Sequence, residues 1–523
     1  MPAAPEPPRS LAQRAAALHR IVVVTLLGFA SGLPLALTGQ ALQAWLTLDG
    51  VDIATIGFLS LVGLPYTFKF LWAPLMDRFD LPLLGRRRGW LVLTQLLLAA
   101  ALAALAGTSP SASIQAFALI AVAVAFMSAS QDVVIDAYRT DLLPAAERGL
   151  GASLNVMGYR LAMIVSGGVA LIWTDPAQQG GWTWPEVYRF MAGLMVVAAV
   201  LSATVLPRVP TPPGPRPPAR QDLLGFAAVL VAVAVGYLLS DRLAQPIAQA
   251  LLGPLLEGTT LEPRLQKRWV DLAALLLGIA FTLPLAAWAA RRARFQTLLG
   301  GLNSYFAVPG ALAFLGLIVL YKLGDAFAGS LMTPFLLKAM AYSPAEVGVV
   351  NKVIGLWLTI GGALLGGALM IKIGLWRALL VFGVLQAASN LGFWWLAVNG
   401  AGVLPGLTLP AFDWWFVKLD TPTPVDGGLL MVIAFENLSG GMGTAAFVAF
   451  LMSLCNQRFT ATQFALLSAF ASIGRVWVGP LAGVLAESIG WPTFFILSTV
   501  LALPALGMLW RLRGPIRALE TQT

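Results

Sequence analysis

Long apolar runs separated by short polar segments dominate the chain from end to end. Six runs lie in the first part, at Ile21–Leu46, Ile53–Met76, Trp90–Ala106, Ser113–Tyr138, Leu150–Trp173 and Tyr188–Leu206. Six lie in the last, at Ser304–Leu337, Ala345–Ile371, Trp376–Val398, Leu429–Leu454, Thr462–Ala486 and Trp491–Trp510. Two more, Leu223–Leu239 and Trp269–Ala290, lie between them. Because about 20 apolar residues in a helix cross a bilayer, the pattern predicts 14 transmembrane helices.

The same pattern divides the chain into five parts. Residues 1–20 and 512–523 are tails, 21–206 and 301–511 are two six-helix halves, and 207–300 hold a linker with two inserted helices. The linker sequence, PRVPTPPGPRPPAR, has too many prolines for a helix. We therefore expect an all-α polytopic membrane protein in which a two-helix insertion joins two six-helix halves.

Basic residues mark one side of the predicted membrane protein. With the N-terminus placed in the cytoplasm, 20 of the 33 Lys and Arg residues fall on the cytoplasmic side, six on the opposite side and seven in or at the ends of runs. This asymmetry follows the positive-inside rule and predicts that both termini are cytoplasmic. The net charge of +9 therefore reflects topology, and no nucleic-acid partner is expected.

Composition narrows the chemistry further. The chain has 58% hydrophobic and 11% charged residues, one cysteine and one histidine. These counts exclude a disulfide within the chain, a histidine proton relay and a Cys–His zinc site. We find no phosphate-binding loop, dinucleotide fingerprint or nucleophile elbow, so we expect neither a cofactor nor ATP-driven transport.

The two halves resemble each other weakly. The fifth run carries Arg160 with Gly168 eight residues later, and its counterpart in the second half carries Arg475 and Gly483 at the same spacing. Two six-helix halves related by an axis along the membrane normal, with a site between them, are the parallel-repeat plan of transporters.

Carboxylates stand out in the segment SASQDVVIDAYRTDLLPAAERG, which begins inside the fourth run. Asp132 and Asp136 lie four residues apart on one helical face, and Arg139 follows. Carboxylates in hydrocarbon are costly, so they usually face a partner or a wet cavity on an ion route. Together with Asp325 of the seventh core run, they are candidates for proton coupling. The alternative is an acid paired with a base only for packing.

Bases and amides deep in other runs are candidates for substrate binding. Arg160 and Arg475 lie roughly 16–20 Å inside their runs at the rise of a helix. Guanidinium groups bind carboxylates with two hydrogen bonds, so these residues indicate an anionic substrate. The alternative pairs each arginine with Asp132, Asp136 or Glu436. Further candidates of this kind are Lys322, Lys352, Glu436 and Asn437.

The loop APLMDRFDLPLLGRRRGW, between the second and third runs, resembles the signature loop of the major facilitator superfamily. In that family an acid at the helix end and the arginines of the loop form a charge latch. Asp77, Arg78, Gly85, Arg86 and Arg87 take those places here, and Arg139 is a further gating candidate. The loop is longer than the family pattern, and its counterpart in the second half lacks the acid. A plain positive-inside loop is the alternative.

Several segments together resemble the AmpG muropeptide permease family. They are KFLWAPLMDRFDLPLLGRRRGW, SASQDVVIDAYRTDLLPAAERG, LGDAFAGSLMTPFLLKAM, VGVVNKVIGLW and FENLSGGMGTAAFVAFLMSLCNQRFTATQFALLSA, spread over roughly residues 20–510. The resemblance implies a major facilitator fold with two added helices in a Gram-negative inner membrane. Gln131, Asp132 and Asp136 match the family's motif in the fourth helix, and Gln131 is a further candidate for substrate binding.

The resemblance implies a function as well: proton-driven import of GlcNAc-anhydroMurNAc, with or without stem peptide, for peptidoglycan recycling. It links the protein to β-lactamase induction and thus to antibiotic resistance. The expected partners are the anionic muropeptide, protons and the lipid bilayer, with the chain a monomer and not an enzyme. The alternatives are a carrier for another bulky anion such as acetyl-CoA, an intramembrane transferase with Asp132 or Asp136 as base, and a receptor that does not transport.

Overall fold

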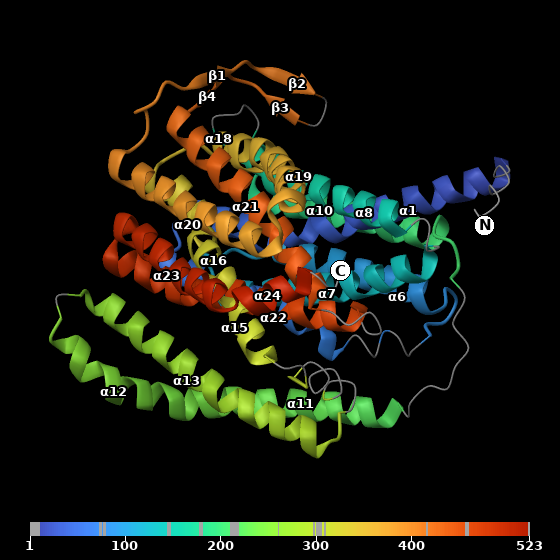
Figure 1. The fold of residues 1–523 in the computed structure, drawn as a ribbon, viewed down its shortest axis with the longest axis horizontal. Coiled ribbons are helices and arrows are strands. Elements are labelled where there is room, and N and C mark those ends of the chain that lie inside the picture. The colour runs from blue at the N-terminus through green and yellow to red at the C-terminus, as the bar shows by residue number, and fades with distance from the viewer. Residues whose placement is uncertain are drawn as a thin grey trace.

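The structure is a computed structural model that describes residues 11–72, 76, 80–143, 148–176, 181–209, 219–259, 261–295, 299, 306–307, 310–414, 417–454 and 460–520. Its first half is helical (Figure 1), with α1 Leu11–Thr38, α2 Gln40–Leu48, α3 Ile53–Leu59, α4 Leu64–Phe68, α6 Arg86–Ala106, α7 Ile114–Leu142, α8 Arg148–Met163, α9 Ala170–Trp173 and α10 Trp184–Thr204. Short turns, η1 Ser60–Gly63, η2 Lys69–Leu71 and η4 Ile164–Val169, join or extend pieces of the second and fifth helices.

The insertion is a long helical hairpin. Its first arm is α11 Ala219–Leu239, η5 Ser240–Ala244 and α12 Gln245–Glu257, and its second arm is α13 Pro263–Arg292. The sequence predicted that the first arm ends at Leu239, where the apolar run meets Asp241 and Arg242. That expectation is wrong, because the helical hydrogen bonds continue past the two charges through a π-helical turn.

The second half repeats the helical pattern. Its elements are α15 Ala311–Tyr321, α16 Leu323–Ser330, α17 Met332–Pro334, η6 Phe335–Ala339, α18 Pro344–Val347, η7 Gly348–Ile354, α19 Gly355–Ile373, α20 Leu375–Asn399, α21 Gly427–Ser453, α22 Thr460–Ile489, α23 Trp491–Arg511 and α24 Arg513–Glu520. Within the described ranges, twelve helices are long and apolar enough to cross a membrane, so the protein is a multi-pass membrane protein. Two shorter apolar helices, Ile53–Phe68 and Trp477–Ile489, lie where two further spans were predicted.

Four short strands, which the sequence analysis did not anticipate, lie between α20 and α21. The strand β1 Leu407–Leu409 pairs antiparallel with β4 Thr423–Val425, and β2 Phe412–Trp414 pairs with β3 Val417–Leu419. They lie at one end of the helical bundle (Figure 1). We call this end, which also carries Asp52 and Asp175, the strand face. The opposite end, with Arg86–Arg88, Asp141 and Pro207, is the basic-loop face.

Glycines bring the helices of each half into close contact. A Cβ atom added to Gly28 or Gly32 of α1 would overlap the backbone of Asn155 or Tyr159 of α8, and one added to Gly158 would overlap the backbone of Thr25. Small residues allow such backbone-to-backbone approach between membrane helices. This contact ties the first helix of the half to the fifth.

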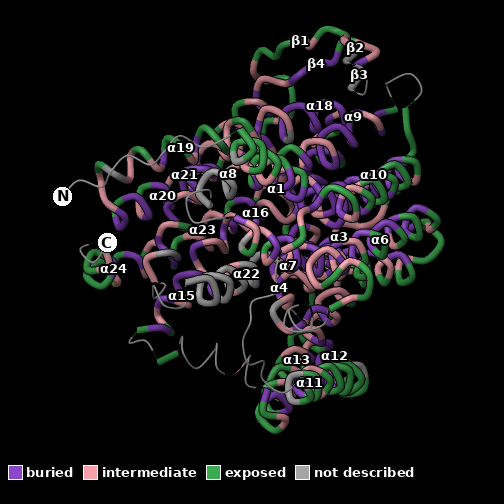
Figure 2. Tube along the Cα trace, turned by 90° about the vertical axis from the view of Figure 1, so that its right-hand side faces the viewer, coloured by how far each residue is buried: buried purple, intermediate pink, exposed green. Residues whose placement is uncertain are grey.

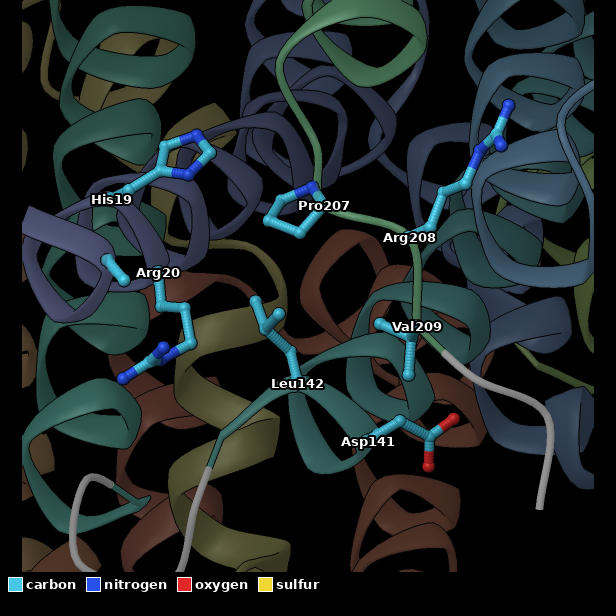
Figure 3. Close-up of a pocket in the computed structure, with 8 residues that line it drawn as sticks. His19, Arg20, Asp141, Leu142, Pro207, Arg208 and Val209 are labelled. Carbon is cyan, nitrogen blue, oxygen red and sulfur yellow. The ribbon is translucent and has the colours of Figure 1, made fainter. Parts of the chain in front are cut away.

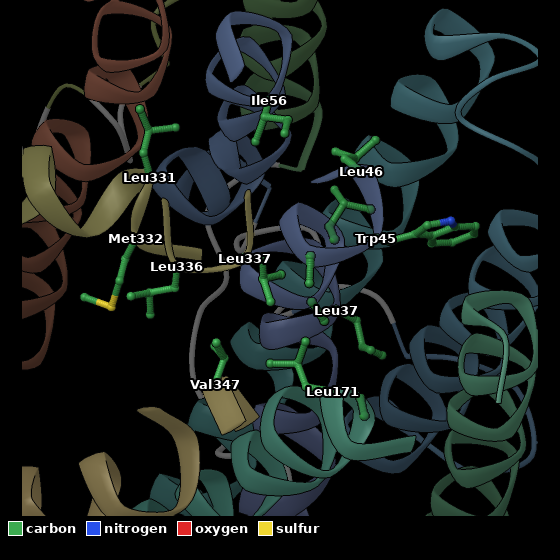
Figure 4. Packing of buried hydrophobic residues seen from close by; sticks show 14 of the residues in the cluster. Leu37, Trp45, Leu46, Ile56, Leu171, Leu331, Met332, Leu336, Leu337 and Val347 are labelled. Carbon is green, nitrogen blue, oxygen red and sulfur yellow. The ribbon is translucent and has the colours of Figure 1, made fainter. Parts of the chain in front are cut away.

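The two halves meet at the strand face. Their largest buried hydrophobic cluster combines residues of both halves, and Figure 4 shows Leu37 and Leu171 of the first near Leu337 and Val347 of the second. Across the described part of the chain, the extensive contacts between the halves join α2, α3, η4 and α9 of the first half to α17, α18, η6, η7, β3 and α22 of the second at this end, and they continue inward where η1 and α4 pack on α22. The strand face is therefore closed.

A carboxylate of each half also accepts a hydrogen bond from the first turn of a helix in the other half. Asp175, which follows α9, accepts a hydrogen bond from the backbone N–H of Ala345 in α18 at 2.9 Å. Glu487 of α22 accepts one from the backbone N–H of Ala54 in α3 at 3.0 Å. Backbone N–H groups at a helix start lack partners in their own helix and favour anions, so both bonds stabilise the closed face.

We predict that Gly32→Val destabilises the protein by about 1–3 kcal/mol, because the added side chain forces α1 and α8 apart. The measurement is the thermal unfolding of the purified protein in detergent. Gly193→Val is the matched control, since Gly193 is an exposed helical position with no atom within 4 Å of an added Cβ. An unchanged melting temperature for Gly32→Val would show that the close contact carries no stability.

Candidate functional site

The two carboxylates of the fourth span lie in one cluster with bases from neighbouring helices. Asp132 of α7 is half-buried, and its Oδ1 accepts a hydrogen bond from Ser31 Oγ of α1 at 2.5 Å. Asp136 is 57% exposed, with Arg139 Nη2 at 3.3 Å and Lys69 Nζ at 4.0 Å from its carboxylate oxygens. The structure thus brings three predicted residues together and adds Lys69 and Ser31. The sequence analysis did not select Lys69 as a candidate, although a single base in the second apolar run could have indicated a partner for these carboxylates.

Arg139 also ties this cluster to the helix pair α1 and α8. Its Nη1 donates to Asn155 Oδ1 at 2.8 Å, and Asn155 Nδ2 donates to the carbonyl of Val24 at 3.1 Å. Asn155 is buried, so each of its hydrogen bonds matters for the packing of α8 on α1. The role of Arg139 seen here is to connect α7 with its neighbours.

Gln131, beside Asp132, is completely buried, and neither atom of its side-chain amide has a hydrogen-bond partner among the described residues. A buried polar group without a partner costs about 1–3 kcal/mol. The amide of Gln131 therefore keeps its hydrogen-bonding capacity for a partner other than the described side chains.

Arg160 of α8 is half-buried inside a predicted span and forms no hydrogen bond or ion pair with any described residue. The alternative pairing with Asp132, Asp136 or Glu436 is not seen, although the structure describes all three side chains. Arginine carries five N–H donors and stays charged at any accessible pH. An arginine in this state attracts an anion.

The second half contributes a polar group on α16 and α21. Lys322 Nζ lies 3.4 Å from Asp325 Oδ2 and 3.3 Å from Thr444 Oγ1, and it stands 5.8 Å from the centre of the Phe447 ring. The ring of Tyr321 stacks on Phe447 at 5.4 Å. The ammonium group of Lys322 thus contacts the carboxylate of Asp325, the hydroxyl of Thr444 and the ring of Phe447.

The predicted pair on α21 acts within its own half. Asn437 Nδ2 donates to Glu436 Oε2 at 2.6 Å, and its Oδ1 accepts from Thr359 Oγ1 of α19 at 2.9 Å. Asn437 therefore connects α21 with α19. Lys352 and Arg475 lie on η7 and α22, but their side chains lie outside the described residues.

The arginines of the predicted charge latch pair with Asp141, which was not the predicted acid. Asp77 and Arg78 lie outside the described residues, while Gly85 takes a left-handed φ of 76° immediately before α6. Arg87 Nε binds Asp141 Oδ2 at 2.8 Å, and Arg86 Nη2 lies 4.0 Å from the same oxygen. The arginines of the loop thus hold the end of α7. Asp141 was not among the predicted gating residues.

A pocket of about 410 Å³ opens beside this ion pair on the basic-loop face (Figure 3). It is lined by Ala16, His19, Arg20, Asp141, Leu142, Pro207, Arg208 and Val209. None of these belongs to the predicted substrate-binding set, so this pocket is separate from the clusters around Asp132 and Lys322. The described residues include no group of three or more His, Cys, Asp or Glu side chains that could hold a metal ion.

Comparisons with known proteins agree on a transporter. The family model described as Major Facilitator Superfamily matches residues 24–417. The chain is 42% identical to the anhydromuropeptide permease of Escherichia coli (strain K12) over 490 residues, which is 94% of this chain and 79% of the relative. It is 26% identical to the putative transporter AmpG 4 of Rickettsia conorii over 501 residues, 95% of this chain and 97% of the relative.

Solved structures match across the whole length. A crystal structure of the POT family transporter PepTSo matches with a TM-score of 0.59 at 16% identity, covering 99% of this chain and 100% of that one. An inward-open structure of the xylose transporter XylE from E. coli matches with a TM-score of 0.55 at 13% identity, covering 94% and 95%. At these identities the matches concern the fold.

Proposed function

The chain belongs to the Major Facilitator Superfamily, and we propose that it imports anhydromuropeptides across the inner membrane of a Gram-negative bacterium. The observation that carries the proposal is the 42% identity to an anhydromuropeptide permease over 94% of the chain. The relatives and structural neighbours are permeases and transporters, so the protein is a transporter and not an enzyme. In organisms with an inducible β-lactamase, the imported muropeptide would also serve as the inducing signal.

We place both termini in the cytoplasm and count 14 spans, twelve long and two short. The basic-loop face then lies in the cytoplasm, as the positive-inside rule requires, and the strand face lies in the periplasm. Because the contacts between the halves gather at the strand face, the described conformation is closed to the periplasm. It corresponds to the state that releases cargo inward.

Arg160 is the strongest candidate for contact with the cargo. Stem peptides carry carboxylates, and a guanidinium without a partner among the described residues supplies paired N–H donors for one of them. Arg475 holds the equivalent position in the second half and would complete a two-sided site. The amide of Gln131, which has no partner among the described residues, offers two N–H donors and an acceptor oxygen to a sugar hydroxyl or a peptide group.

Proton coupling is assigned to Asp132 and Asp136, with Asp325 as the third candidate. Both carboxylates of α7 are balanced by bases and a hydroxyl that lie on other helices or one turn away. Protonation of either carboxylate would weaken these attractions and loosen α7 from α1 and the second span. A proton bound in one state and released in the other would thereby drive the change of conformation.

The proposal is tested by uptake of labelled anhydromuropeptide into proteoliposomes, with and without an imposed inward proton gradient. Accumulation that depends on the gradient is the expected result. Binding without accumulation would indicate a receptor, and no binding at all would contradict the proposed substrate. Acetyl-CoA in place of the muropeptide tests the alternative anion.

We predict that Asp132→Asn and Asp136→Asn each abolish gradient-driven accumulation, because an amide cannot take up and release a proton. Asp271→Asn is the matched control. Asp271 is a carboxylate within the inserted hairpin that accepts a hydrogen bond from Gln245 Nε2 at 3.1 Å. Full accumulation by both α7 variants would remove these residues from the coupling role.

We predict that Arg160→Ala weakens binding of the peptide-bearing ligand by about tenfold to a hundredfold, the loss expected for hydrogen bonds to a charged group. Isothermal titration of the purified protein measures this, with the bare disaccharide as the comparison ligand. Arg189→Ala, an exposed arginine of α10, is the control. An equal loss for both ligands would count against binding of a peptide carboxylate by Arg160.

A further inference from the structure

The inserted hairpin lies outside the two six-helix halves and yet touches both. Figure 2 shows α11, α12 and α13 as a group that extends away from the rest of the bundle. The helix α13 begins at the strand face with Arg264, Lys267 and Arg268 in its first two turns. From there it runs along α22 of the second half.

Two carboxylates from different halves share the N-terminus of α3. Asp52 caps this helix, because its side chain accepts hydrogen bonds from the backbone N–H of Thr55 at 2.8 Å and from Thr55 Oγ1 at 2.7 Å. Glu487 of α22 accepts the neighbouring N–H, that of Ala54. The helix start attracts both anions, but the two anions repel each other.

Arginines of the hairpin neutralise this pair. Arg264 Nη2 lies 3.4 Å from Asp52 Oδ1 and 3.3 Å from Glu487 Oε1, so one guanidinium bridges the two halves. Arg268 Nη2 lies 3.2 Å from Asp52 Oδ2 and donates to Thr55 Oγ1 at 2.5 Å. Burial alone would raise the pKa of Asp52, but the hydrogen bonds from Thr55 and the charges of Arg268 and Arg264 lower it below its usual value. The carboxylate therefore stays ionised and keeps its partners.

Apolar side chains of the hairpin also pack where α3 of the first half meets α22 of the second. Leu272 of α13 is buried together with Ala54 of the first half and Val484 of the second. Trp269 Nε1 donates to Ser488 Oγ of α22 at 3.0 Å. The hairpin is thus fixed to α3 and α22 at once by charge and by packing.

The helices α3 and α22 must separate for the strand face to open. A Cβ atom added to Gly57 of α3 would overlap the backbone of Gly479 and Gly483 of α22, so the two helices lie in direct backbone contact. If α3 and α22 separate, Arg264 can follow either Asp52 or Glu487 and loses the other.

We propose that the inserted hairpin is a clamp that biases the transporter toward the state with a closed strand face. Its Arg264 and Arg268 hold the carboxylates of the two halves together, and a strand face that opens must break this bridge. The inference concerns the balance between conformations and holds for any cargo.

The test measures the opening of the strand face at a position away from the clamp. Ala345 is completely buried where α18 meets the end of α9, and Cys455 is the single cysteine of the chain. The reporter protein carries Ala345→Cys with Cys455→Ser, and a membrane-impermeant maleimide reports how often the face opens. Arg264→Gln with Arg268→Gln is the clamp variant.

We expect the clamp variant to label about threefold to tenfold faster, the effect of losing three partly exposed ion pairs. Lys267→Gln is the matched control, since Lys267 is an exposed base on the same turn of α13 with no ion pair to a described residue. Size-exclusion profiles verify that all variants are folded. Labelling of the clamp variant at the rate of the parent protein would overturn the proposal.

A second comparison tests the mechanism. Glu487→Gln removes the partner in the second half, so Arg264→Gln should add little to it if the two side chains act on each other. Fully additive effects on the labelling rate would show that Arg264 does not act through Glu487. Because labelling needs no cargo, a negative result here is distinct from a failure of the muropeptide uptake assay.

Discussion

The contact between the two halves at the strand face is the constraint on which the rest of the structure depends. Asp175 at the end of the fifth helix binds the start of α18, and Glu487 at the end of its counterpart α22 binds the start of α3. Gly168 and Gly483 lie in the same two junctions, where each closely approaches the opposite half. The repeat therefore places one anion and one glycine at each junction, and the two junctions close the face together.

The two halves meet at the strand face, whereas the polar groups in the interior make contacts within their own half. Polar groups of the first half, on α7 and α8, are held by contacts inside that half, as are those of α16 and α21 in the second. No ion pair joins Arg160 to a described carboxylate, so the two halves can rotate relative to each other without breaking an ion pair between that arginine and a described residue. A cargo that binds to both halves would then link its own binding to the relative rotation of the halves.

The sequence predicted much of the fold, because the membrane imposes a length and a composition that apolar runs reveal directly. Two local ion pairs, Asp136 with Arg139 and Lys322 with Asp325, follow from a spacing of three residues on a helix, but the sequence analysis gave these residues separate roles and did not predict the pairs. It missed the strands between Leu407 and Val425, which are too short for a period of two to be visible. Partners such as Ser31 and Asp141 were missed because only tertiary packing brings them to Asp132 and Arg87.

We propose that the two halves move about the inner site, so that one face opens while the other closes. Double electron–electron resonance measures this with spin labels on exposed positions, Ala112 and Ala401 at the strand face and Leu83 and Lys372 at the basic-loop face. We predict that anhydromuropeptide with an inward proton gradient lengthens the first distance and shortens the second in the same fraction of molecules. Distances that stay fixed, or that change in the same direction at both faces, would contradict it.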